Sequence, residues 1–312
     1  MRGKLKAILT GGAGFIGSHI ADDLIDKGAK VLVIDDLSSG DINNLSDSVE
    51  FINLNIADYK LSDQLKKFNG DVLIHCAAQA SVSHSIDEPS FDAEVNILNG
   101  IKLMDYAIES NVNSYVYLNT GGALYGEPEY LPCDEQHPIK PISPYGLSKY
   151  TLENYFDILL PASANFISLR LANVYGPRQD PGGEAGVVAI FAQKMLNNEN
   201  VIIFGDGDQS RDFVYVKDVA AAVILALQSE TNGHINIGSG EQTTVTQIFE
   251  NLSAEIGYQK KPIYKPERKG DVKHIYLNVE KARANLGWTA HMNLQNGLRE
   301  TVNLLRSNKE VN

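Results

Sequence analysis

Cysteine is scarce in this chain, with two residues, Cys76 and Cys133, among 312. They make no disulfide framework, and no Cys/His cluster has zinc-site spacing, so we expect reduced thiols and no metal. Long apolar runs are missing, and Met1-Arg2-Gly3-Lys4 leads straight into a predicted strand, which indicates neither a secretory leader nor a membrane anchor. The net charge of −12 argues against nucleic acid or an anionic membrane as partner. We expect a cytoplasmic protein.

What the chain does contain is an alternation of short apolar runs with helical patterns. This alternation predicts a parallel sheet with helices on both faces, a doubly wound α/β fold. Because 312 residues exceed the size at which one core stops growing, we also expect a smaller C-terminal α/β domain. The predicted strands are 6–10, 31–35, 49–54, 72–78, 114–119, 166–174 and 235–238, and the predicted helices lie near 15–28, 59–68, 91–112, 144–160, from 187 onward, and over 217–229.

A glycine-rich loop follows the first predicted strand. Gly11, Gly14 and Gly17 let the backbone turn tightly and approach a pyrophosphate at the start of the next helix. The second strand ends at Asp35-Asp36, about 20 residues further on, where a carboxylate binds a ribose diol. A carboxylate there repels a 2′-phosphate, so the pattern favours NAD over NADP. The alternative interpretation is an ordinary strand–turn–helix with a glycine cap.

Polar and small residues follow three other predicted strands. They are Asp58, Ala77-Ala78-Gln79 and Asn119-Thr120-Gly121-Gly122. Ligands of doubly wound sheets bind beyond the carboxyl ends of the strands, so we expect these residues to face the cofactor. His75 ends a buried run, and we expect it to be a hydrogen-bonded core residue.

The segment Ser143–Lys149 places a tyrosine and a lysine four residues apart near a helix start. Ser143 suits the N-cap and Pro144 the first turn, so Tyr145 and Lys149 lie on one helix face. A phenol ordinarily ionises near pH ~10. The nearby ammonium is expected to move the pKa of Tyr145 toward neutrality, which would make it a usable base.

Several motifs together resemble the extended short-chain dehydrogenases, and most closely the UDP-glucose 4-epimerase type. They are Thr10–Gly17, Asp35, Tyr125-Gly126, Tyr145–Lys149 and Arg170–Gly176, and segments 183–191 and 204–216 narrow the resemblance to nucleotide-sugar enzymes. The resemblance implies an NAD-binding Rossmann domain over 1–176 plus about 213–238. It implies a nucleotide-sugar domain over about 177–212 plus 239–312.

The resemblance also implies an activity, inversion of C4 of a UDP-hexose such as UDP-galactose or UDP-glucose through a 4-keto intermediate. Tyr145 is then the base, Lys149 lowers its pKa and holds the nicotinamide ribose, and Thr120 is the third catalytic residue. Many family members carry a hydroxyl residue one position later, where this chain has Gly121. No Asp-Glu pair follows Thr120, which argues against a 4,6-dehydratase.

Further contacts are assigned by the motifs and the resemblance together. The cofactor residues are Gly11, Gly14, Phe15, Ile16, Gly17, Asp35, Asp36, Ser39, Gly40, Ile56, Asp58, Ala77, Ala78, Gln79, Asn96, Tyr145 and Lys149. The substrate residues are Thr120, Gly121, Asn173, Val188, Arg211, Arg268, Asp271 and Ile275. Arginine suits phosphate because its fork forms paired charge-assisted bonds. The alternative for Arg211 is an ion pair with Asp206, Asp208 or Asp212, and the alternative for Arg178 as a site residue is a solvated loop charge.

The same resemblance leaves other activities and the assembly open. Alternatives are a UDP-N-acetylhexosamine or UDP-glucuronate 4-epimerase, a UDP-glucuronate decarboxylase, a conventional dehydrogenase, and a non-catalytic NAD-binding scaffold. Ile275 is the predicted gatekeeper for N-acetyl sugars. Helices 91–112 and 144–160 carry apolar residues on more than one face and predict a homodimer, although burial within one subunit explains the same pattern.

Overall fold

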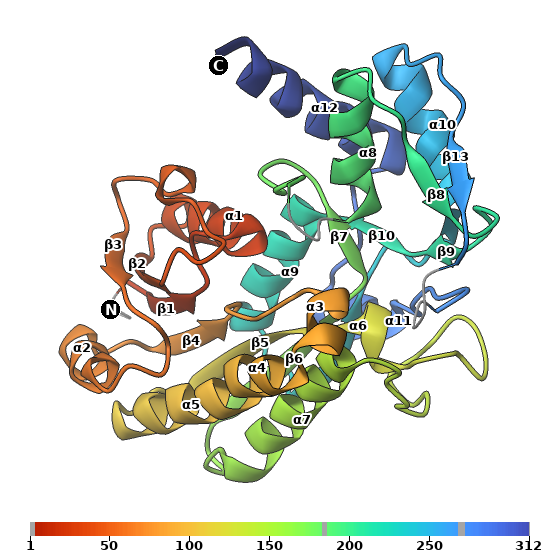
Figure 1. Ribbon diagram of the computed structural model, residues 1–312. Coiled ribbons are helices and arrows are strands. Elements are labelled where there is room, and N and C mark those ends of the chain that lie inside the picture. Colours follow the sequence, from red (N-terminus) through yellow and green to blue (C-terminus); the bar gives the residue numbers. More distant parts are fainter. Residues whose placement is uncertain (1–3, 183–185, 268–271, 312) are drawn as a thin grey trace.

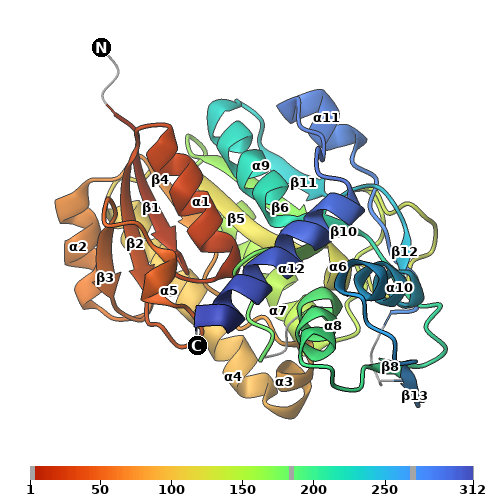
Figure 2. The same ribbon diagram turned by 90° about the horizontal axis from the view of Figure 1, so that it is seen from above.

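Apolar residues, many of them branched, dominate the central strands, since strands covered on both faces are buried over most of their length. The computed structural model describes residues 4–182, 186–267 and 272–311. In it, seven parallel strands make one sheet in the order β11-β6-β5-β4-β1-β2-β3 (Figure 1; β11 is labelled in Figure 2). Their bounds are β1 Lys6–Thr10, β2 Lys30–Asp35, β3 Glu50–Asn53, β4 Val72–His75, β5 Ser114–Thr120, β6 Asn165–Leu171 and β11 Gly233–Ile237.

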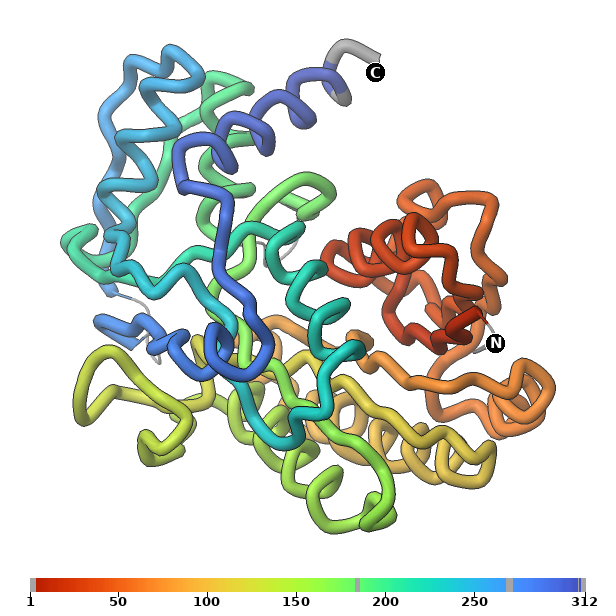
Figure 3. The backbone as a smooth tube through the Cα atoms, turned by 180° about the vertical axis from the view of Figure 1, so that it is seen from behind, coloured from red at the N-terminus to blue at the C-terminus, as the bar shows by residue number. Residues whose placement is uncertain are grey.

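Helices cover both faces of this sheet, which confirms the predicted doubly wound α/β fold. On one face α1 (Phe15–Asp26) packs against α9 (Val216–Gln228), as Figure 3 shows from behind. The other face carries α2 (Lys60–Phe68), α5 (Asn99–Glu109) and α7 (Pro144–Leu159). Each face has its own buried apolar cluster, so the sheet is the partition between two cores.

The helix predicted over 91–112 is divided into three consecutive pieces. These are α4 (Pro89–Ala93), a π-helical turn η2 (Glu94–Leu98) and α5. The π turn coincides with Asn96, whose side chain is 2% exposed and makes several buried hydrogen bonds. A wide turn of this kind marks functional sites in many helices, and a periodicity argument cannot detect it.

Two predicted strands end three residues earlier than expected in the structure. The run 166–174 divides into β6 and β7 (Asn173–Tyr175), because Ala172 N–H bonds Ile237 O while Asn173 N–H bonds Asp212 O. β7 pairs with β10 (Phe213–Tyr215), outside the central sheet. The run 72–78 stays extended only to His75, where β4 ends. The strand expected at 235–238 is β11, which returns to the sheet beside β6.

The remaining elements surround a third apolar cluster, formed by buried residues between Tyr175 and Val302. Here α12 lies across α8 and α10, seen from above in Figure 2. Trp288 belongs instead to the apolar cluster on the sheet face that carries α1 and α9, and it donates from Nε1 to Asp218 O. These elements are α8 Val187–Leu196, β8 Ile202–Phe204, β9 Ser210–Arg211, β12 Thr243–Thr244, α10 Val245–Ile256, β13 Ile263–Lys265 and α12 Leu294–Val311. The helix α11, Glu280–Leu286, packs instead against β11 and α9 of the central sheet. Short helical pieces elsewhere are η1 Ile42–Asn44, α3 Val82–Asp87 and α6 Gly121–Leu124.

Candidate active site

A cavity of about 1000 Å³ lies at the carboxyl ends of the central strands. One wall consists of residues at or just beyond the ends of β1, β2, β4, β5 and β6. The opposite wall comes from the C-terminal elements and includes Val188, Arg211 and Val272. Its volume is within the range of ligand sites and is large enough for a cofactor beside a substrate. Seventeen predicted site residues line it: Gly11, Gly14, Phe15, Ile16, Gly17, Asp35, Asp36, Ser39, Ile56, Ala77, Ala78, Thr120, Tyr145, Lys149, Asn173, Val188 and Arg211.

The glycine loop leaves no room for side chains at two positions. Gly11 has φ +67°, and a Cβ there would lie 2.6 Å from Ala77 N. A Cβ on Gly17 would lie 2.2 Å from Gly11 O. The loop can therefore approach the start of α1 and the end of β4 only with glycine at both positions.

The cavity has the donors and acceptors that a dinucleotide requires. Gly14 precedes α1 without a side-chain cap, so the first-turn amides of Phe15 and Ile16 and the positive end of the helix dipole remain for a pyrophosphate. The Asp35 carboxylate accepts hydrogen bonds from Ala13 N and Leu37 N, both at 2.9 Å, which fixes it at the cavity wall. Each oxygen retains a second lone pair for a ribose hydroxyl. The residues present therefore fit NAD.

The start of α7 holds the predicted base. Ser143 accepts from Gly146 N–H at 3.1 Å, as its N-cap prediction requires, and Tyr145 N–H donates to Ser85 Oγ at 3.1 Å. The Thr120 and Tyr145 side chains both line the cavity, and the Thr120 hydroxyl is near enough to the phenol to lower its pKa. Thr120 Oγ1 also accepts from Ala123 N–H at 3.2 Å, which caps α6 and fixes the hydroxyl. Thr120 and Tyr145 thus meet from a strand end and a helix start.

The pKa of Tyr145 differs from the expectation. Burial raises it to about 12, the Thr120 hydroxyl opposes this rise, and the Asp92 charge adds to it. Burial also lowers the pKa of Lys149 to about 8, although the neighbouring Cys76, Asp92 and Glu153 act in the other direction. Removal of both groups from water outweighs the attraction that the four-residue spacing suggested.

Two residues predicted to contact the cofactor lie behind the cavity lining. Gln79 N–H donates to Asn96 Oδ1 at 2.9 Å, and Asn96 Nδ2 donates to Gln79 O at 2.9 Å and to Asp92 Oδ1 at 3.0 Å. This reciprocal pair fixes the irregular segment after β4. Gln79 and Asn96 therefore support the wall that Ala77 and Ala78 form.

Four further predicted residues are not part of the lining either. Asp58 Oδ1 accepts from Lys60 N at 2.9 Å at the start of α2, so its carboxylate is engaged there. A Cβ on Gly40 would lie 3.0 Å from Asp35 Oδ1, which places Gly40 beside the Asp35 carboxylate. Gly121 is buried at the start of α6. Ile275, 2% exposed, packs in the core, so its gatekeeper role remains a prediction.

The predicted phosphate-binding arginines differ in their hydrogen-bond and ion-pair partners. Arg211 lines the cavity, and its Nη1 donates to Ser210 O at 2.8 Å and to Lys273 O at 3.3 Å. Arg178 also lines it, with Nη1 2.8 Å from Asp22 Oδ2. The predictions at Arg268 and Asp271 lie outside the described residues.

Other candidate sites carry little chemistry. His75 is 2% exposed, its Nδ1 lies 2.8 Å from Thr10 Oγ1, and burial lowers its pKa to about 3, which confirms a neutral core residue. Within the described ranges, no group of three or more His, Cys, Asp or Glu could hold a metal. Over the same residues, no helix has the length and apolarity to cross a bilayer.

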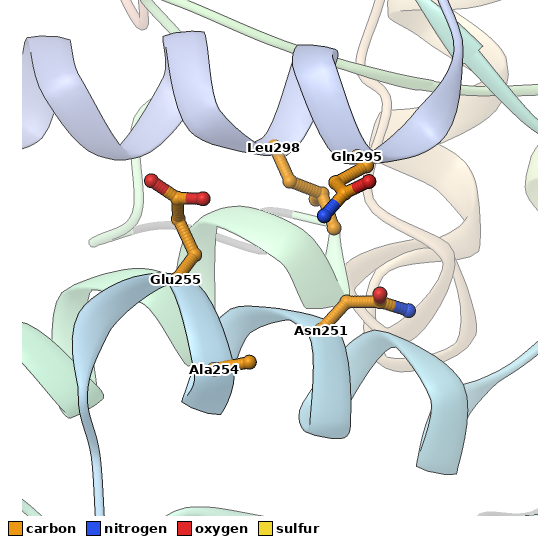
Figure 4. A pocket seen from close by; sticks show the side chains of 5 residues that line it. All are labelled: Asn251, Ala254, Glu255, Gln295 and Leu298. Atoms are coloured by element: carbon orange, nitrogen blue, oxygen red, sulfur yellow. The ribbon is translucent and has the colours of Figure 1, made fainter.

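A second cavity of about 140 Å³ lies between α10 and α12 (Figure 4). It is lined by Asn251, Ala254, Glu255, Gln295 and Leu298, and its volume is below the usual size of ligand sites.

Sequence reasoning missed two features of the site. Leu304 and Leu305 of α12 line the cavity, and no local pattern connects them with the glycine loop. Arg170 in β6 and Glu153 in α7 form a buried ion pair behind Thr120. An arginine inside an apolar strand was a usable signal, since such residues are almost never fully buried unless paired.

Comparison with known proteins agrees with this geometry. Residues 7–238 match the model of the NAD dependent epimerase/dehydratase family. A UDP-glucose 4-epimerase of Mycolicibacterium smegmatis is 38% identical over 98% of this chain and 100% of its own length. The crystal structure of Thermotoga maritima UDP-glucose 4-epimerase with UDP-glucose is 44% identical, with a TM-score of 0.95 over 98% of this chain and 100% of that one.

A second solved structure includes the cofactor. The UDP-glucose 4-epimerase of Thermus thermophilus in complex with NAD is 39% identical, with a TM-score of 0.91 over 97% of this chain and 99% of that one. The family match spans most of the central sheet and the segments that contain Thr120 and Tyr145. The chain therefore belongs to the NAD-dependent epimerase/dehydratase family.

Proposed function

We propose that the protein is a UDP-glucose 4-epimerase that uses NAD to interconvert UDP-galactose and UDP-glucose. The observation that carries this proposal is that Thr120, Tyr145 and Lys149 line one cavity, which extends from the glycine loop to the C-terminal elements. The 4-epimerases of M. smegmatis and T. maritima, similar over nearly the whole chain, support it.

NAD is held by the glycine loop, the start of α1 and Asp35. When bound, it supplies the hydride acceptor and donor that amino-acid side chains lack. Asp35 leaves no favourable place for a 2′-phosphate. The loop amides and Asp35 orient the two ends of the cofactor, and Lys149 is placed to hold the nicotinamide ribose.

Tyr145 and Thr120 act on the sugar hydroxyl at C4. Tyr145 removes the proton from that hydroxyl and later returns it, while Thr120 hydrogen-bonds the same oxygen and fixes its position. With a pKa of about 8, Lys149 is mostly protonated at neutral pH, and its charge favours the phenolate. The nucleotide is held at Asn173 and Arg211, with Arg268 and Asp271 as further predicted contacts. The sugar itself can therefore rotate between removal and return of the proton.

The decisive experiment uses the protein as purified, without added NAD. Incubation with UDP-galactose is expected to give UDP-glucose, measured by chromatography or a coupled assay. No UDP-glucose from a preparation that demonstrably contains NAD would refute the proposal. Stoichiometric release of NADH would instead identify a conventional dehydrogenase, and the ratio of rates on UDP-galactose and UDP-N-acetylgalactosamine measures the sugar preference.

We also propose two lobes, with NAD bound by 1–176 plus about 213–238 and the UDP-sugar by the rest. The pairing of β11 with β6 and the separate apolar cluster around α8, α10 and α12 support this division. A cytoplasmic location is likewise proposed, supported by two cysteines that are both free thiols.

A homodimer through helices 91–112 and 144–160 completes the proposal. Large apolar side chains on α4, η2 and α7 are exposed: Phe91 47%, Leu98 55%, Leu147 55%, Tyr155 38% and Ile158 76%. Because α4 and η2 pack beside α7, these side chains come from neighbouring elements. Clustered exposed apolar residues are typical of protein interfaces, and a two-fold axis would bury both copies.

A further inference from the structure

The buried pair Glu153–Arg170 lies behind the catalytic residues. The two side chains are 0% and 2% exposed, and Arg170 Nη2 is 2.7 Å from Glu153 Oε1. Burial alone would raise the pKa of Glu153, but the hydrogen bonds and charge of Arg170 hold it below its usual value, so the carboxylate is ionised. Burying an ion pair gives little net stability by comparison with apolar packing, so stability is a weak explanation for it.

The second carboxylate oxygen of Glu153 leads to the catalytic threonine. Oε2 accepts from Asn119 Nδ2 at 2.7 Å, which fixes the orientation of the Asn119 amide. Asn119 Oδ1 in turn accepts from Thr120 N–H at 2.8 Å. Three residues thus form an unbroken chain of hydrogen bonds that ends on the backbone of Thr120.

Glu153 also shares a helix face with the other catalytic residues. Tyr145, Lys149 and Glu153 follow one another at four-residue intervals on α7. One carboxylate therefore connects the helix that carries Tyr145 and Lys149 with the strand that carries Thr120. Rotation or sliding of α7 against β5 would have to break this connection.

We propose that Glu153 is a positioning residue of the epimerase reaction, which through Asn119 holds Thr120 in register with Tyr145. Arg170 supplies the counter-charge that lets a carboxylate be buried at this point. The inference rests on the proposed function. It adds to the reaction a residue that contacts neither substrate nor cofactor.

The test is placed at Asn119, because a Glu153 variant would leave Arg170 buried without its counter-ion and endanger the fold. Asn119→Ala breaks the chain to Thr120. Ser168→Ala is the matched control: Ser168, also 0% exposed, donates to the same Glu153 Oε2 at 2.5 Å but lies on β6, away from the hydrogen bond that Asn119 makes with Thr120. Both variants lose one hydrogen bond to one carboxylate oxygen.

We expect Asn119→Ala to lower kcat on UDP-galactose by about 100-fold, with KM and NAD content close to wild type, because a small misplacement of a reacting group costs about that much. Exchange of the Thr120 amide hydrogen is expected to accelerate in Asn119→Ala alone. Ser168→Ala should keep kcat close to that of wild type, even where both variants melt at similar temperatures.

Two results would overturn the positioning role. One is wild-type kcat and wild-type Thr120 amide protection in Asn119→Ala, and the other is an equal loss of kcat in both variants. Inactive wild-type protein would count against the proposed function separately. In that case the Thr120 exchange rates, which need no turnover, still decide whether Asn119 fixes the threonine.

Discussion

The Lys149 ammonium lies over the ring of Tyr117, with Nζ 4.3 Å from the ring centre. Both side chains are buried, at 3% and 0% exposure, so water does not weaken the attraction, which is worth about 2 kcal/mol when desolvated. The Tyr117 hydroxyl also donates to Lys149 O at 3.3 Å. One tyrosine of β5 therefore holds both the charge and the backbone of Lys149.

Replacing this ring is expected to affect turnover. In Tyr117→Leu the ammonium loses its partner, the pKa of Lys149 falls further, and kcat should fall about 10- to 30-fold. Tyr117→Phe keeps the ring and should lose much less. Steady-state kinetics at neutral pH on both variants measure the difference, and equal losses would show that the hydroxyl, and not the ring, matters.

The lowered pKa of Lys149 predicts a pH dependence of stability. The unfolded lysine has a pKa near 10.5 and the folded one about 8, so the unfolded state binds more protons between these values. The free energy of unfolding should therefore rise between these two pH values, by about 3 kcal/mol relative to a variant without this group. Lys149→Met is that variant, and denaturant titrations at several pH values compare the two proteins. If the free energies of unfolding of wild type and Lys149→Met changed with pH in parallel, burial would not perturb the pKa of Lys149.

Tyr145→Phe is expected to abolish turnover and retain UDP binding. The phenol is the proton acceptor in the proposed reaction, whereas the proposed nucleotide contacts Asn173 and Arg211 lie on β7 and β9, outside the helix that carries Tyr145. Turnover of UDP-galactose and calorimetric titration with UDP test the two parts. Thr120→Ser, which keeps a hydroxyl, is the control and should stay active; activity in Tyr145→Phe would exclude Tyr145 as the base.

Gly17→Ala should release NAD. The new Cβ would lie 2.2 Å from Gly11 O, so the loop has to move away from the pyrophosphate position. Gly28→Ala is a suitable comparison, because its φ of +79° is strained for alanine, at about 1–2 kcal/mol, while no atom lies within 4 Å. Both variants should lose stability, measured by thermal unfolding. The NAD content of each purified protein is measured after denaturation, and only Gly17→Ala should contain much less NAD than wild type. A wild-type NAD content in Gly17→Ala would contradict the prediction.

The proposed dimer is tested by a charge on α7. Ile158→Glu should shift the protein from dimer to monomer, because a carboxylate would be buried against the second copy. Tyr59→Glu is the matched control, since Tyr59 is also 76% exposed but belongs to the start of α2. Light scattering after size-exclusion chromatography gives both masses. A monomeric wild type at micromolar concentration would refute the interface.

The sequence was informative where chemistry is local. The cavity contains Gly11, Gly17 and Asp35 because one loop and the next strand end determine their positions. The pKa of Tyr145 was not predictable in this way, because it depends on how much water the folded chain removes. The break between β6 and β7 depends on Asp212 and Ile237, far along the chain, so the run 166–174 by itself indicated a single strand.

The position of β11 limits how this protein can be divided. It is an edge strand of the cofactor sheet, yet it follows the segment 177–212 that belongs to the proposed sugar lobe. A fragment ending at Gly176 would therefore expose β6 as a long apolar edge, a recognised starting point for aggregation. Exchanging sugar lobes between relatives would require two separate grafts, one inserted between β7 and β10 and one after β11.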